Sequence, residues 1–81
     1  MPRYYFDICE GDDVTPDDEG LELTTIEAVQ MEAAHALADM MRDAVRARRQ
    51  GVGHRMAIEV RNDKGPVLMV LSTFEVKRHR Q

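Results

Sequence analysis

The apolar positions between Thr24 and Arg49 recur with the 3.6-residue period of an α-helix, and they form two stripes rather than one. The first stripe comprises Ile26, Val29, Ala33, Leu37, Met40 and Ala44. The second stripe is rotated by roughly 110° at 100° per residue, and it comprises Met31, Ala34, Ala38, Met41 and Val45. A helix on one face of a small sheet buries a single stripe. The second stripe therefore predicts a further partner.

Strand patterns lie on both sides of this helix. Residues 3–9 and 55–61 alternate between apolar and polar positions, residues 21–23 form a short apolar-polar-apolar segment, and residues 67–76 form a last strand. The residues expected to face the helix are Tyr4, Phe6 and Ile8 in the first strand and Met56, Ile58 and Val60 in the third. Residues 67–71 are apolar at every position, so both faces of the last strand are expected to be covered there.

Turn and capping residues separate these segments. Residues 10–20 form a polar, acidic connection, in which we expect Asp18 to bond the turn backbone and Gly20 to adopt a positive φ. Thr24 and Glu27 have the spacing of a capping box at the helix start. Gly51 and Gly53 are expected to end the helix, and residues 62–65 to form a turn.

The order strand–strand–helix–strand–strand predicts an α+β fold, a four-stranded antiparallel sheet with one long helix on one face. A right-handed crossover gives the strand order 2-1-3-4. Residues 1–76 form the expected single domain, followed by a basic C-terminal tail at residues 77–81.

A chain of 81 residues buries a modest core, and such small domains usually gain stability from disulfides, a metal or a partner chain. The single cysteine, Cys9, cannot form an internal disulfide and fits a reducing cytoplasm. No apolar run approaches the length of a membrane span, and the N-terminus enters a strand pattern without a signal peptide. These observations favour a cytoplasmic protein that binds a partner chain.

Charge is distributed unevenly along the chain. Residues 1–39 carry eleven acidic side chains and one basic one, a net charge of −10, whereas residues 40–81 carry four acidic and ten basic ones, a net charge of +6. We favour mutual attraction of the two halves across the strands of one sheet over a molecule with separate acidic and basic ends.

The side chains that could carry chemistry have simpler interpretations. Cys9 and the three histidines lack the spacing of a zinc site, and no catalytic triad or Cys-His pair is visible, so no cofactor, metal or catalytic residue is expected. The acidic residues 10–20 could bind a hard cation but do not follow the calcium-loop pattern, and a solvated hairpin tip is favoured. His35 is expected to face solvent and Cys9 to be half-buried. Asp7 and Glu59 are expected to pair with Arg61 or Arg55 across strands.

Two basic segments leave a nucleic-acid role open. Residues 77–80 form the tail, and residues 46–49 lie at the helix end. Neither contains aromatic residues, and the whole chain is acidic, with a pI of about 5.2. Helix C-terminal charge and a solubilising tail are therefore favoured over phosphate binding.

Several segments together resemble a family of small alphaproteobacterial domains of unknown function. They are residues 3–8, residues 18–23, Glu27-Ala28 and residues 58–61 before Gly65-Pro66-Val67. This resemblance implies no activity and no functional residue. More loosely, a hairpin followed by a helix that opens with Thr25-Ile26-Glu27-Ala28 resembles part of the HicB-type antitoxin domain, which implies partner binding and oligomerisation. The proline- and glycine-rich second strand and the DNA-binding segment of that family are absent here.

The sequence thus predicts a small non-enzymatic interaction module that forms a homodimer or binds another protein. The alternative is a regulator associated with nucleic acid through its basic tail. The candidate partner interface comprises Met31, Ala34, Ala38, Met41, Val45, Val67, Met69 and Leu71.

Overall fold

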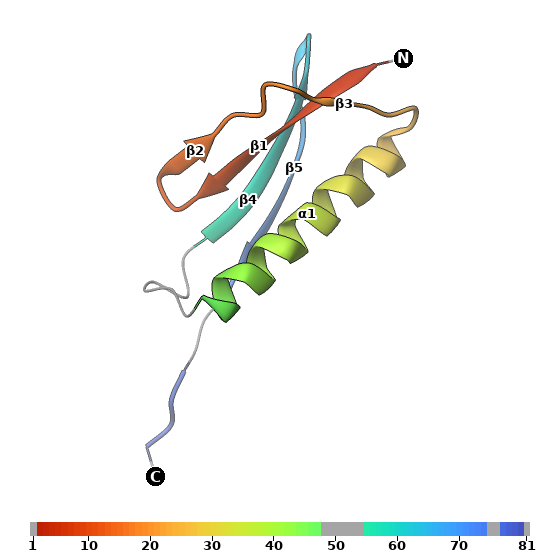
Figure 1. Ribbon diagram of the computed structural model, residues 1–81. Coiled ribbons are helices and arrows are strands. Elements are labelled where there is room, and N and C mark those ends of the chain that lie inside the picture. The colour runs from red at the N-terminus through yellow and green to blue at the C-terminus, as the bar shows by residue number, and fades with distance from the viewer. Residues whose placement is uncertain (1, 48–54, 75–76, 81) are drawn as a thin grey trace.

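The computed structural model describes residues 2–47, 55–74 and 77–80, and it places one long helix on one face of an antiparallel sheet (Figure 1). Strand β1 (Arg3–Glu10) pairs with β4 (Arg55–Asn62), which pairs in turn with β5 (Gly65–Thr73). The short strands β2 (Asp13–Thr15) and β3 (Leu21–Glu22) also pair with β1. The order is β2-β1-β4-β5, with β3 on β1. The four predicted strands correspond to β1, β3, β4 and β5, so the predicted α+β class and the predicted order 2-1-3-4 are confirmed.

Strand β2 is an element that the sequence pattern did not predict. It interrupts the acidic connection, where Val14 lies opposite Cys9 of β1. Its three residues include a single apolar one, which is too little for a period-of-two pattern. The pairing comes from the tight return of the chain at Gly11, whose φ is +62°.

Helix α1 (Ile26–Arg46) begins one residue later than the predicted capping box implies. The N-cap is Thr25, not Thr24: its backbone is extended, with φ −132° and ψ 155°, and its hydroxyl accepts a hydrogen bond of 3.0 Å from Ala28 N. The predicted capping box of Thr24 and Glu27 is therefore wrong: the cap lies one position later, and the residue three positions after it is Ala28. The helix ends at Arg46, and the N–H of the C-cap residue Ala47 donates to the carbonyl of Asp43. Gly51 and Gly53 lie outside the described residues.

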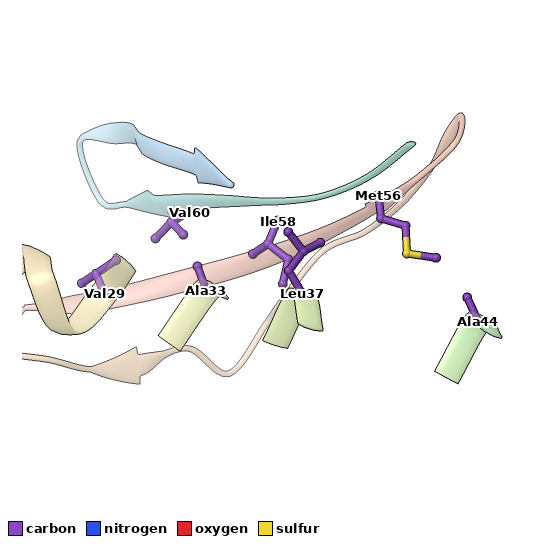
Figure 2. Close-up of a cluster of buried hydrophobic side chains, with 7 residues drawn as sticks. All are labelled: Val29, Ala33, Leu37, Ala44, Met56, Ile58 and Val60. Carbon is purple, nitrogen blue, oxygen red and sulfur yellow. The ribbon is translucent and has the colours of Figure 1, made fainter. Parts of the chain in front are cut away.

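The core lies between α1 and the facing side of β4. Figure 2 shows its seven buried side chains, with Leu37 beside Ile58. They are Val29, Ala33, Leu37 and Ala44 of α1 and Met56, Ile58 and Val60 of β4. Tyr4, Phe6, Met40, Leu68 and Val70 pack around them and are partly buried. The first stripe is thus the buried face of the helix, as predicted.

Two predicted core residues are more exposed than expected, Ile8 at 37% and Ile26 at 46%. The helix packs mainly on β4 and β5, so the β1 side of the sheet receives less cover. Ile26 is the first residue of the helix and lies at its open end.

The β4–β5 hairpin follows its predicted turn. Asn62 pairs with Gly65, Asn62 Oδ1 accepts a 2.9 Å hydrogen bond from Lys64 N, and Gly65 has a φ of +126°. A bulge between Val60 and Arg61 then shifts the register of the pairing. The described strand ends at Thr73, and Val76 lies outside the described residues.

The expectation that both faces of β5 are covered is wrong for the single chain. Leu68 and Val70 turn toward the helix and are partly buried, but Met69 and Leu71 are exposed on the opposite face. The described part of the chain supplies a helix to one face of the sheet alone. The uninterrupted apolar run therefore belongs to a strand with one covered face and one exposed face.

Candidate interaction surface

The second stripe of α1 is uncovered along most of its length. Met31, Ala34, Ala38 and Val45 are exposed, with 55% exposure at Met31 and 46% at Val45. Met41 differs because it is partly buried and packs against the core. Four of the five residues therefore form an exposed apolar strip on the helix, interrupted at Met41.

Strand β5 contributes the remaining candidate residues. Met69 is 47% exposed and Leu71 is 60% exposed, whereas Val67, next to the bulge, is partly buried. Beyond β4, no described strand pairs with β5, so one edge of β5 is open within the described part of the chain. None of its nine residues is charged.

Lysines, short strands and bulges normally keep an open edge from pairing with another chain. The opposite edge of this sheet has such protection, since β2 and β3 contain three and two residues and the acidic connection covers β1 there. On β5, Pro66 and the bulge protect the start of the strand alone. Residues 68–73 carry no such device. The two edges of the sheet are thus built differently.

The outer face of the sheet, opposite the helix, extends the apolar area. Cross-strand register places Val14, Cys9, Ala57 and Leu71 in one row across β2, β1, β4 and β5. Val14 is 62% exposed. Sequence reasoning missed Val14 because it missed β2, and the signal that could have found it is the apolar residue two positions after Asp12 in an otherwise polar stretch.

A polar cluster lies beside this row and joins β1, β4 and the connection after β2. Asp7 accepts hydrogen bonds from Arg61 Nε at 2.7 Å and Arg61 Nη2 at 3.3 Å, as the cross-strand prediction expected. Arg61 also donates to the carbonyl of Asp17 at 3.0 Å, and its guanidinium lies 4.7 Å from the Tyr5 ring centroid. This ion pair thus joins the acidic and basic halves of the chain across two strands.

Asp17, rather than the predicted Asp18, organises the acidic connection. Its Oδ2 accepts from Phe6 N at 3.1 Å, and its Oδ1 accepts from Glu19 N at 3.0 Å and Gly20 N at 3.2 Å. Its own N–H donates to Asp7 at 2.9 Å. The predicted positive φ of Gly20 is confirmed at +75°. A Cβ at Gly20 would lie 2.9 Å from side-chain carbons of Arg3 and Tyr5, so the loop is held tightly against β1.

The ionisation of this cluster follows from its contacts. The hydrogen bond from Arg61 is the largest influence on the pKa of Asp7 and lowers it, although burial acts in the opposite direction. Burial acts to raise the pKa of Asp17, but the amides of Glu19, Phe6 and Gly20 outweigh it and hold that pKa below its ordinary value. Carboxylates that are ionised and already occupied by donors are poor proton acceptors near neutral pH. The cluster of Asp7, Asp17 and Arg61, called the acidic clamp below, therefore holds the connection against β1.

The other candidate sites have fewer described contacts between their side chains than this polar cluster. A hollow of about 440 Å³ lies at the hairpin end of the sheet and is lined by Pro2, Arg3, Tyr5, Asn62, Asp63 and Lys64. His35 is exposed on the helix, and Cys9 is a half-buried free thiol, as predicted for both. Among residues 2–47, 55–74 and 77–80, no three His, Cys, Asp or Glu side chains gather to hold a metal ion. In that same part of the chain, no helix is long and apolar enough to cross a membrane.

The basic tail is exposed at residues 77–80 and has no regular secondary structure there. Figure 1 draws these residues apart from the sheet and the helix. The other basic segment comprises residues 46–49, and its residues 48 and 49 lie outside the described residues.

Sequence comparison assigns nearly the whole chain to one family. Residues 3–75 match a family described as a domain of unknown function, DUF6894. The chain belongs to the DUF6894 family. No curated protein and no solved structure shows significant similarity to it. For this DUF6894 domain, the arguments for function therefore rest on its own surfaces.

Proposed function

We propose that this DUF6894 domain is a small non-enzymatic interaction module that self-associates as a homodimer through the second stripe of α1, strand β5, or both. The observation that carries the proposal is the coincidence of an uncovered apolar helix stripe and an unprotected, uncharged sheet edge. Contiguous apolar surface of this kind marks sites of association rather than ordinary solvent-facing surface.

The size of the core supports the same proposal. Among the residues that the structure describes, seven side chains are buried, two of them alanines, which is a modest hydrophobic core for a domain of this length. Burial of the second stripe against another chain would add apolar area at about 25 cal/mol per Å² before the cost of association. A second copy therefore offers the stability that a disulfide or a metal gives to other small domains.

The polar groups favour a binding role over catalysis. The Asp7–Arg61 pair and the Asp17 turn are engaged with one another and with backbone amides, which leaves them suited to holding a loop. The looser likeness of the hairpin and helix start to HicB-type antitoxin domains supports partner binding. We also place the function in the cytoplasm, where the single thiol of Cys9 remains reduced.

Sedimentation equilibrium of the full chain tests the proposal. The homodimer predicts a mass near twice 9.3 kDa at micromolar concentration, and a mass of 9.3 kDa would refute it. Ala38→Glu should shift the equilibrium toward monomer because it places a charge in the exposed stripe, whereas His35→Glu, on the polar side of the same helix, should not. Ala38 is a better test position than Met41, since Met41 also packs against the core.

The second candidate function is regulation in association with nucleic acid through residues 77–80, whose side chains are exposed. It predicts salt-sensitive binding of DNA or RNA by the full chain that a chain ending at residue 76 lacks. Equal and negligible binding by both chains would remove this candidate.

A further inference from the structure

The proposed self-association can be taken to a specific arrangement, because one symmetry operation would cover both open surfaces. We infer that two copies pair their β5 strands antiparallel about a two-fold axis, which forms one continuous sheet and packs the two α1 helices side by side through their second stripes. This inference rests on the proposed function and names the partner as a second copy of this chain.

The position of the helix over the sheet is the first step. Helix α1 packs mainly on β4 and β5, so its axis lies near the gap between these two strands. The connection from β3 through α1 to β4 joins parallel strands on either side of β1, and such crossovers are right-handed. With a right-handed helix, the second stripe then lies on the β5 side of α1 rather than on the β1 side. The open stripe and the open edge are neighbours.

Strand spacing supplies the second step. Paired strands lie about 4.8 Å apart, so a helix above the gap between β4 and β5 lies about 2.4 Å inward from β5 when projected onto the sheet. A second β5 at the pairing distance would bring its own helix about 9–10 Å from the first. Packed helices have interaxial distances of 8–10 Å. Pairing of the edges alone therefore places the two helices at contact distance.

The sequence of the stripe provides the third step. A two-fold axis perpendicular to the sheet makes the two helices antiparallel. If they cross near Ala38, Met31 of one copy lies beside Val45 of the other, because both residues are seven positions from Ala38. Ala34 and Ala38 then lie where the backbones approach most closely, with the larger side chains on either side. The stripe is complementary to itself.

The same two-fold axis is compatible with the position of β5 and with the charges at the two ends of α1. Val70 pairs with Ile58, and Ile58 lies beside Leu37 (Figure 2), so the middle of β5 is level with the middle of the stripe. The antiparallel helices place the first turn of one copy, with Glu27, near the last turn of the other, with Arg46. The pairing residues of β5 carry no charge that would oppose the contact.

Cysteine cross-linking tests the crossing point. In a Cys9→Ser background, Ala38→Cys should form an intermolecular disulfide under mild oxidation, because helices 9–10 Å apart bring residues near the axis within the Cα separation of 4.4–6.8 Å that disulfides allow. The matched control is His35→Cys in the same background, which should remain monomeric on a non-reducing gel. Equal cross-linking of the two variants, or none at Ala38→Cys, overturns the arrangement.

Charge on the edge tests the strand pairing. Met69→Lys combined with Leu71→Lys should weaken the dimer by more than about tenfold, since like charges would face one another across the new strand pair. Val14→Lys, an equally apolar and exposed position on the opposite edge, should leave the affinity within about twofold. A wild-type chain that sediments as a monomer refutes the proposed function itself. A wild-type dimer that is unchanged by the β5 lysines refutes only this arrangement.

Discussion

Replacement of Asp17 by alanine tests whether this one carboxylate holds the acidic connection (residues 10–20) against β1. The other acidic residues of the connection are left unchanged. The carboxylate accepts three backbone hydrogen bonds, and two of them, from Phe6 N and Gly20 N, are partly buried. A net hydrogen bond to a charged group contributes about 1.5–3 kcal/mol, and exposure reduces the contribution of the bond from Glu19. We therefore expect Asp17→Ala to lower the free energy of unfolding by about 2–4 kcal/mol.

Urea denaturation at one fixed protein concentration measures this loss, because the concentration affects the apparent stability of a dimer. With a slope of about 1–2 kcal/mol per molar, the midpoint should fall by about 1–4 M. Asp18→Ala is the matched control: it removes the same charge from the neighbouring exposed position and should stay within about 0.5 kcal/mol of wild type. If Asp17→Ala is no more destabilising than Asp18→Ala, the clamp does not hold the connection.

Three further predictions concern stability and one concerns the tail. Leu37→Ala should cost about 2–5 kcal/mol by urea denaturation, because Leu37 packs beside Ile58 in the core, and a cost typical of surface sites, below about 1 kcal/mol, would contradict its placement. Gly20→Ala should destabilise the protein by about 1–3 kcal/mol more than Gly11→Ala. Both glycines have a positive φ, but of the two only Gly20 would bring a Cβ against other atoms. Equal effects of the two substitutions would contradict the tight packing of Gly20 against β1. The folded pKa values of Asp7 and Asp17 lie below the ordinary value of 3.8, so their stabilisation should be fully present above about pH 4 and be lost as the pH falls below it; Asp7→Asn should flatten that loss in acid-unfolding curves. Deletion of residues 77–81 should leave the urea midpoint unchanged, as expected for an exposed tail, and a fall in the midpoint would show that the tail packs on the domain.

The parts of the fold that were predictable are those with a repeated pattern. The first helix stripe and the alternation of Met56, Ile58 and Val60 place the same residues in the core that the structure buries. The strand order followed from crossover handedness, a rule that does not depend on particular side chains. Long periodic segments average over many residues, so single exceptions such as Ile26 do not change the prediction.

The errors lie where one residue decides the local structure. Thr24 and Thr25 are chemically equivalent, and only the backbone conformation before the helix selects Thr25 as the cap. Asp17 and Asp18 are likewise chemically equivalent. Only Asp17 lies where its carboxylate accepts a hydrogen bond from the N–H of Phe6 on β1. Tertiary geometry makes these choices, and sequence spacing does not contain it.

The candidate interface was predictable in part. The sequence identified the second stripe because a helix of this length carries more apolar surface than a four-stranded sheet can cover. It did not reveal that Met41 packs against the core, because this contact depends on where the helix lies over the sheet. The apolar run of residues 67–71 predicts a strand covered on both faces, whereas within one chain Met69 and Leu71 are exposed on one of them.

The most direct test of the proposed dimer is an isotope-filtered NOE experiment on an equimolar mixture of labelled and unlabelled chains. The proposed dimer predicts intermolecular contacts from the Ala38 methyl group to the second stripe of the other chain. It also predicts contacts between Met31 of one chain and Val45 of the other. It also predicts intermolecular contacts between the β5 strands around Val70. A mixture that gives no intermolecular contacts at millimolar concentration, or contacts confined to surfaces other than α1 and β5, would contradict it.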